Sequence, residues 1–303
     1  MPGSLTPRAR PRDSITLTDA ARPATFSVDA VDEHGRTVPT AIAGEHPLTL
    51  YLDKRELVTL MTLGGAPEDL AVGWLRNQRL LAAVGEIASV QVDWDVEAVS
   101  VTTRSLAERG VPLWERGADR GALDARLGRR TVTTGCGQGT VFGDLMGEID
   151  SVSLPEQARL SEETLYAVME RVRRHESIYK VAGAVHGCAL CANAGDERGE
   201  ILVFVEDVGR HNAVDAIAGR MWLDDIAGED KVFYTTGRLT SEMVIKCAQM
   251  RIPFLLSRSG LTEMGWRIAT RIGITMIGRC QGRHYLVFSG LHRFATPART
   301  ALT

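Results

Sequence analysis

The residues of this chain best suited to chemistry lie in one stretch, residues 201–218, which reads ILVFVEDVGRHNAVDAIA. The five apolar residues at 201–205 predict a buried strand, and the apolar spacing from residue 212 predicts a helix. Between them lie the polar side chains of Glu206, Asp207, Arg210 and His211. Open α/β sheets bind ligands where a strand ends and a helix begins, so this turn is a candidate site. A solvated turn with local ion pairs is the alternative interpretation.

A second candidate is Cys136, which lies in the sequence TTGCGQGT. The glycines at 135, 137 and 139 leave the backbone free to present several N–H groups to a thiolate. A thiolate is the nucleophilic form of cysteine, so Cys136 is a candidate nucleophile. The alternative interpretation is a small buried thiol in a turn.

Composition limits the classes of function. The chain has 303 residues, a net charge of −3 and both signs of charge spread along its length, which argues against nucleic acid as the main partner. It has no apolar run long enough to span a bilayer, and its first residues lack the apolar core of a signal peptide. Five cysteines without a secretion signal indicate free thiols, so we expect a cytoplasmic protein.

The elements that must position these residues follow from periodicity. We expect a disordered tail at residues 1–24 and a strand-rich N-terminal subdomain at 25–130, which ends in a mobile connection from residue 104. An α/β domain follows at 131–303, because strands and helices alternate there. The predicted strands are 47–52, 56–63, 87–94, 98–103, 201–205, 232–235, 253–257, 274–277 and 285–289. The predicted helices begin at Pro67 and after Ser161 and cover 212–221, 240–250 and 262–272.

Several segments resemble those of one protein family and occur in the family's order. These segments are EDVGRHNAVDA, the cysteine loop TTGCG, TGRLTSEMVIKCA at 236–248, IGRCQGRHYLVFS at 277–289 and MTLGGAPEDLAVGWL at 61–75. Together they resemble the signatures of the formate dehydrogenase accessory sulfurtransferases, the FdhD family. The resemblance runs from about residue 48 to about residue 289.

The resemblance implies a cytidine-deaminase-like α/β fold for the larger domain. It implies a sulfurtransferase that takes persulfide sulfur from a cysteine desulfurase onto Cys136. The sulfur would then pass to the molybdenum cofactor, Mo-bis(molybdopterin guanine dinucleotide), for a formate dehydrogenase. A homodimer is also implied. The family often has Cys-x-x-Cys in this loop, whereas Gly139 stands here in place of the second cysteine.

The resemblance also implies a binding site for the guanine dinucleotide. The residues that it assigns to the site are Arg279, Cys280, Gln281, Gly282, Arg283 and His284. Arg238 and Ser241 lie between a predicted strand and a predicted helix, so they are further donor candidates at a helix N-terminus. Arg279 and Arg283 would clamp phosphate in a bidentate fork, which a lysine cannot form. We expect supporting roles for four further residues. His186 would shape a polar pocket or aid proton transfer near the sulfur, and Asp207, Arg210 and His211 would contact the ligand or brace the loops.

Cys188 and Cys191 lie in the segment GAVHGCALCA and leave three interpretations open. They are two buried structural thiols, a replacement for the lost loop cysteine, or a metal site with His186. The zinc site of a deaminase does not match, because Cys188 stands where the catalytic Glu would be, and no metal is expected. Two rival functions remain beside the sulfur carrier. One is a non-catalytic chaperone that holds and inserts the molybdenum cofactor, and the weaker one is a zinc-dependent deaminase that uses His186, Cys188 and Cys191.

Overall fold

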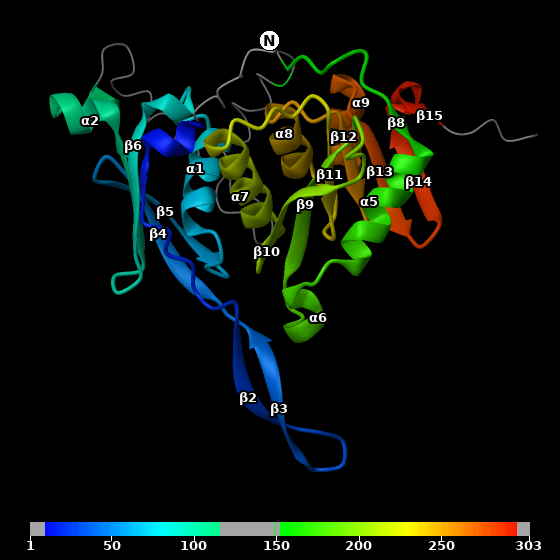
Figure 1. The fold of residues 1–303 in the computed structure, drawn as a ribbon, viewed down its shortest axis with the longest axis horizontal. Coiled ribbons are helices and arrows are strands. Elements are labelled where there is room, and N and C mark those ends of the chain that lie inside the picture. The colour runs from blue at the N-terminus through cyan, green and yellow to red at the C-terminus, as the bar shows by residue number, and fades with distance from the viewer. Residues whose placement is uncertain (1–9, 116–148, 150–151, 296–303) are drawn as a thin grey trace, which may run out of the picture.

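The computed structural model describes residues 10–115, 149 and 152–295. The predicted α/β fold class is confirmed, because the chain forms two mixed sheets with helices between and around them (Figure 1). Among the described residues, no helix is both long and apolar enough to cross a bilayer. The cytidine-deaminase-like topology stays a prediction.

The N-terminal half is a five-stranded sheet of order β1-β6-β7-β4-β5. Its strands are β1 (Thr16–Leu17), β4 (His46–Leu52), β5 (Arg55–Thr62), β6 (Ile87–Asp93) and β7 (Ala98–Thr103). The four longer strands were all predicted, 87–94 and 98–103 from alternating apolar residues. On β4 the alternate residues Leu48, Leu50 and Leu52 are fully buried. Helix α1 (Pro67–Asn77) begins at the proline as predicted and covers this sheet.

Two predictions for the N-terminal half are wrong. Residues 10–24 are not a disordered tail, because η1 (Pro11–Ser14) and β1 are ordered there and Trp94 Nε1 donates to the carbonyl of Ala20. Residues 104–115 are not a mobile connection, since they form α2 (Arg104–Arg109) and η3 (Leu113–Glu115). The predicted boundary at residue 130 lies outside the described residues.

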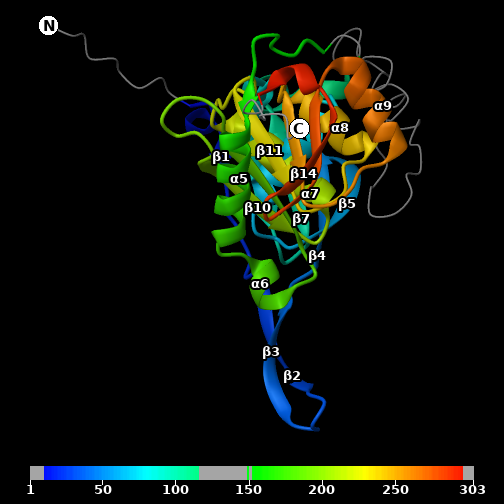
Figure 2. The same cartoon turned by 90° about the vertical axis from the view of Figure 1, so that its right-hand side faces the viewer.

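A β-hairpin that the sequence analysis did not predict extends from the body beneath α6 (Ile178–Ala182) (Figures 1 and 2). It consists of β2 (Thr25–Val31) and β3 (Thr37–Ala43). Phe26 pairs with Ile42, and both lie on one face with Val28; all three are exposed.

The C-terminal half is a six-stranded sheet of order β10-β9-β11-β12-β13-β14. Its strands are β9 (His186–Ala192), β10 (Ile201–Asp207), β11 (Lys231–Thr235), β12 (Phe254–Ser257), β13 (Thr275–Gln281) and β14 (His284–Ser289). One face packs on α5 (Glu162–Arg174). The other packs on α7 (Arg210–Leu223), α8 (Ser241–Gln249) and α9 (Glu263–Ile272). Two short strands, β8 (Leu160–Ser161) and β15 (Phe294–Ala295), pair with each other, and the 3-10 helix η6 (Leu291–Arg293) lies just before β15. A further 3-10 helix, η2 (Val84–Glu86), belongs to the N-terminal half.

The two halves join where α1 crosses α7. A Cβ atom on Gly73 would lie 1.6 Å from the carbonyl oxygen of Asp215, and one on Gly219 would lie 1.9 Å from that of Asp69. Only glycine permits so close an approach of the two backbones. This crossing sets the position of the N-terminal sheet relative to the strand ends of the second sheet.

Candidate functional site

The candidate site lies at the carboxyl-terminal edge of the six-stranded sheet, the edge that is formed by the ends of four strands and not by an outermost strand. β10, β11, β12 and β13 run in the same direction, because β10 and β11 are both antiparallel to β9 and the others pair in parallel. Helices α7, α8 and α9 each begin shortly after one of these strands. Their N-termini carry partial positive charge, so the edge favours anionic groups. The predicted turn after the strand at 201–205 is part of this edge.

A cavity of about 410 Å³ opens at this edge on the side of α5. It is lined by Tyr166, Met169, Glu170, Val172, Arg173, Ser177, Tyr179, Lys180, Gly187, Phe204, Glu206, Tyr234, Thr236, Arg258, Cys280, Gly282 and Arg283. We call it the edge cavity. Its wall combines aromatic rings with cationic side chains, which suits a ligand with a flat ring and an anionic group.

Two arginines in the edge cavity stack on aromatic rings. The guanidinium carbon of Arg258 lies 5.3 Å from the ring centre of Tyr179, and that of Arg283 lies 5.3 Å from the ring centre of Tyr166. Within the described part of the chain, neither guanidinium forms an ion pair with a carboxylate. Their donors are therefore available to a phosphate or carboxylate.

His186 lies beside this cavity, at the start of β9. Its Nδ1 is 3.4 Å from Oγ1 of Thr236, a cavity residue. Burial lowers the pKa of His186, and the positive charges of Arg210, Arg258 and Arg238 lower it further. The imidazole is therefore neutral near pH 7 and can accept a proton at one ring nitrogen.

The residues of the segment RCQGRH divide into two groups. Cys280, Gly282 and Arg283 line the edge cavity. Arg279, Gln281 and His284 are exposed and are not among its lining residues. The expected clamp of Arg279 with Arg283 is therefore not formed by this cavity. Gly282 has a φ of 60° in the turn that joins β13 to β14, a conformation that glycine adopts without strain.

Arg238 and Ser241 are not among the lining residues either. Arg238 is exposed on the loop after β11, and Ser241 begins α8. The structure instead brings in residues that the sequence analysis missed, namely Arg258, Arg173, Lys180 and three tyrosines. Arg258 follows β12 in the same way that Arg238 follows β11, so the rule about strand ends would have found it.

Asp207 braces the loops. This buried carboxylate accepts hydrogen bonds from Thr62 Oγ1 at 2.5 Å, Leu63 N at 3.2 Å and Asn212 Nδ2 at 2.9 Å. Burial raises its pKa, and these donors oppose that rise. Of the two roles considered for Asp207, bracing is therefore the one that its geometry supports.

Arg210 and His211 point to different surroundings. The Arg210 side chain lies over Gly237, where a Cβ would come within 2.6 Å of its Cδ. His211 lines a second cavity, of about 380 Å³, on the far side of α7. There His211 Nε2 is 3.3 Å from Glu242 Oε2, next to the buried pair of Lys246 and Asp215. His211 is thus part of a buried charge network rather than of the edge cavity.

The four described cysteines are all buried. Burial raises the pKa of Cys188, Cys191 and Cys280 to about 12 and that of Cys247 well above its usual value. At neutral pH these thiols stay protonated and are poor nucleophiles. Cys136, the predicted carrier, lies outside the described residues.

The same burial decides between the interpretations of Cys188 and Cys191. Cys188 lies in the core with α7 and α8, whereas Cys191 lies in the core with α5, on the opposite face of the sheet. The two sulfurs cannot bind one metal ion from opposite faces, and no group of three potential metal ligands occurs among the described residues. The structure supports the interpretation of two buried structural thiols and contradicts the metal site. Whether Cys188 or Cys191 faces Cys136 stays a prediction, because Cys136 lies outside the described residues.

Comparison with known proteins gives the family. The model of the FdhD/NarQ family matches residues 43–295. This chain belongs to the FdhD/NarQ family. The match covers the six-stranded sheet and every strand of the five-stranded sheet except β1, and it extends beyond the resemblance seen in the sequence segments.

Individual relatives agree with this family. Over 259 residues, the chain is 29% identical to the sulfur carrier protein FdhD of Listeria innocua, covering 84% of this chain and 92% of that protein. Over 245 residues, it is 28% identical to the FdhD protein of Wolinella succinogenes, covering 81% and 79%. A crystal structure from Desulfotalea psychrophila, described as a formate dehydrogenase accessory protein, has the same fold, with a TM-score of 0.68 and 24% identity over 90% of this chain and all of that one.

Proposed function

We propose that this protein is a sulfur carrier that serves a formate dehydrogenase. The FdhD relatives carry the name sulfur carrier protein, and the structural relative is described as a formate dehydrogenase accessory protein. The observation that carries the proposal for this chain is the state of its thiols. Four of the five cysteines are buried and protonated, which leaves Cys136 in its glycine-rich loop to carry the sulfur.

The accepting step needs only one thiolate. The thiolate of Cys136 attacks the outer sulfur of a persulfide on a cysteine desulfurase, and a new S–S bond forms. The S–S bond of the donor breaks, and the donor cysteine leaves as a thiolate. Cys136 then holds the persulfide, so the Gly139 substitution does not prevent this step.

The acceptor in this proposal is the molybdenum cofactor in its guanine dinucleotide form. The edge cavity supports this, because Arg258 and Arg283, which form no ion pair with any described carboxylate, offer their guanidinium groups to a pyrophosphate beside tyrosine rings that can stack on guanine. Gly282 lets the chain approach the phosphates closely. His186, neutral at pH 7, is placed to accept a proton beside the same cavity.

The test is intact-protein mass spectrometry after incubation with a cysteine desulfurase and cysteine. The wild type should gain mass in steps of one sulfur, dithiothreitol should reverse the gain, and Cys136→Ala should show no gain. Cys188→Ala is the matched control, because its thiol is buried, and it should gain sulfur like the wild type. A gain that persists in Cys136→Ala would contradict the assignment of the carrier.

A rival function is a chaperone that binds and inserts the molybdenum cofactor without carrying sulfur. The loss of the second loop cysteine at Gly139 favours it. The two functions differ in one result, since Cys136→Ala abolishes activation of the formate dehydrogenase if the protein is a carrier and leaves it intact if it is a chaperone.

A further inference from the structure

One wall of the edge cavity is a short helix that packs little against the rest of the chain. α6 is five residues long, and none of its residues is buried. It places Tyr179 and Lys180 in the lining of the cavity. Its neighbour on one side is the hairpin of β2 and β3, which itself projects from the body (Figures 1 and 2). A helix of about one turn is not stable alone, because its first turn fixes several residues for one hydrogen bond, so its position depends on contacts with other elements.

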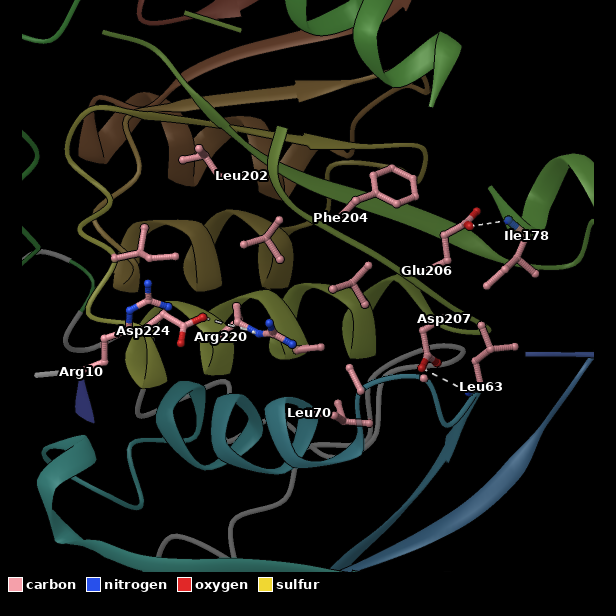
Figure 3. Close-up of a pocket in the computed structure, with 16 residues that line it drawn as sticks. Arg10, Leu63, Leu70, Ile178, Leu202, Phe204, Glu206, Asp207, Arg220 and Asp224 are labelled. Atoms are coloured by element: carbon pink, nitrogen blue, oxygen red, sulfur yellow. Dashed lines mark hydrogen bonds and ion pairs between the residues drawn. The ribbon is translucent and has the colours of Figure 1, made fainter. Parts of the chain in front are cut away.

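Glu206, on the strand β10, supplies such a contact. Its Oε2 accepts a hydrogen bond from Ile178 N at 2.6 Å, and its Oε1 accepts one from Tyr179 N at 3.2 Å. Figure 3 shows the first of these bonds from the side of a groove of about 720 Å³ that Glu206 also lines. The two amides begin the helix, where no carbonyl of the helix can accept from them. The carboxylate therefore provides the acceptors that the first turn of α6 lacks.

An acidic residue in this cavity needs an explanation, because a carboxylate directed at a phosphate would repel it. The cavity is lined by two carboxylates, Glu170 and Glu206. Glu170 is paired with Arg173 and Arg174. Glu206 is instead bonded through both of its oxygens to the N-terminus of α6, where the helix dipole favours a negative charge. Its position fits a support of the cavity wall.

The ring of Tyr179 connects this support to a cation. The guanidinium carbon of Arg258 lies 5.3 Å from the centre of that ring, although Arg258 follows a different element, β12. A guanidinium is attracted to the face of an aromatic ring, so the ring restricts where the long arginine side chain lies. Because Glu206 holds the amide of Tyr179, a shift of α6 would move the ring away from Arg258.

We propose that Glu206 is a positioning residue for Arg258 in the binding of the guanine dinucleotide. Glu206 holds the first turn of α6, and α6 places the ring of Tyr179. The ring in turn keeps the guanidinium of Arg258 directed to the pyrophosphate. This role deepens the proposed function and rests on it for the identity of the ligand. Glu206 acts through the helix and does not touch the ligand.

Calorimetry with the full chain and guanosine diphosphate tests this role. Glu206→Ala and Tyr179→Ala should each weaken binding about fivefold, the upper range for a cation–π contact at an exposed site. The double variant should bind no more weakly than Tyr179→Ala, because both changes act through the same arginine. Glu206→Gln keeps one acceptor oxygen and should recover part of the affinity that Glu206→Ala loses.

Amide hydrogen exchange measures the contact itself, without any ligand. The amides of Ile178 and Tyr179 should exchange faster in Glu206→Ala than in the wild type, since the carboxylate is their acceptor. Glu200→Ala is the matched control. Glu200 lies one residue before β10 and pairs with Arg171 outside the cavity, so its loss should change neither this exchange nor the affinity.

Four results would overturn the role of Glu206. The first is equal binding of guanosine diphosphate by the wild type and Glu206→Ala, and the second is tighter binding by Glu206→Ala, which would show that the carboxylate only repels the anion. The third is a double variant that loses the product of the two single losses, which would show that Glu206 acts independently of Tyr179. The fourth is unchanged exchange at the two amides.

These results are distinct from a failure of the proposed function. If the wild type binds guanosine diphosphate, each of the four overturns the role of Glu206 alone. If the wild type does not bind it, the cavity does not hold a guanine dinucleotide, and the acceptor in the proposed function is wrong together with this role.

Discussion

Replacing Lys246 with methionine should destabilise the protein strongly, because Lys246 holds two buried carboxylates together. Its ammonium lies 2.8 Å from Asp215 Oδ2 and 3.2 Å from Glu242 Oε1, and all three side chains are buried. Asn77 Nδ2 donates to the other oxygen of Asp215 at 2.7 Å, which connects the network to α1.

The magnitude follows from the geometry. At an effective dielectric constant of about 20, a charge pair 2.8 Å apart attracts by about 6 kcal/mol. The cost of burying the ammonium, several kcal/mol, offsets most of this attraction in the wild type. Removing the lysine alone leaves Asp215 and Glu242 buried and uncompensated, and such truncations cost about 3–5 kcal/mol.

The loss should also depend on pH. Burial already raises the pKa of Asp215 in the wild type, and loss of the neighbouring ammonium raises it further. A carboxyl whose folded pKa lies above its unfolded pKa stabilises the fold at low pH and loses that contribution as pH rises through the folded pKa. The stability deficit of Lys246→Met should therefore be largest at alkaline pH and shrink as the solution is made acidic.

Urea unfolding followed by tryptophan fluorescence measures the deficit, since Trp74 is buried and lines the cavity beside Lys246. Arg267→Met is the control: it removes an ion pair with Glu263 in which both side chains are more than 70% exposed, and it should cost less than about 1 kcal/mol. A Lys246→Met deficit below about 1 kcal/mol, or one that does not change with pH, would refute the reasoning.

Four further predictions use other parts of the structure. Brief alkylation of the native protein with iodoacetamide at pH 8 should label Cys136 alone, and mass spectrometry that finds a second label would contradict the raised pKa of the other four thiols. Gly73→Ala should cost more than about 3 kcal/mol in urea unfolding, because its Cβ would overlap the backbone of α7; a cost below about 1 kcal/mol would disprove the contact. Thr62→Val keeps the side-chain volume but removes a donor to buried Asp207, so it should cost about 1–3 kcal/mol in the same assay, and an unchanged midpoint would count against the bracing role. Arg283→Lys should weaken binding of guanosine diphosphate about tenfold in calorimetry, because lysine cannot form a bidentate fork; equal affinity would remove this arginine from the site.

Periodicity predicted most strands of both sheets because each element buries one apolar face, but β1 and β9, which pairs with both β10 and β11, were not predicted. The helix from Ser161 illustrates this, since its predicted cap accepts from Thr164 N and its apolar stripe packs on the sheet. The β2–β3 hairpin was not predicted; its two strands pair with each other, and the apolar side chains Phe26, Val28 and Ile42 on one of its faces are exposed. The order in residues 10–24 was missed because it rests on distant partners, such as Asp69 and Asp224 for Arg12. Contacts between residues so far apart leave no local pattern.

The sequence indicated the location of the candidate site better than it indicated which residues line it. The rule that ligands bind at strand ends points to the edge at which the cavity opens, and Gly282 and Arg283 line that cavity. Whether a residue lines the cavity depends on the direction of its side chain, and residues next to each other in the sequence point in different directions. Arg279 is exposed outside the edge cavity although Cys280 lines it. Segment matching cannot distinguish such neighbours, because both belong to the same motif.

The position of the edge depends on both halves of the chain. The turn after β10 is held by Asp207, whose donors at Thr62 and Leu63 belong to the N-terminal sheet and the segment after it. The helix that follows this turn, α7, is held against α1 by the contact between two glycines. The first turns of α7 carry Arg210, whose charge lowers the pKa of His186 beside the edge cavity. The N-terminal half is therefore a part of the site, because it fixes the helix end from which that charge acts.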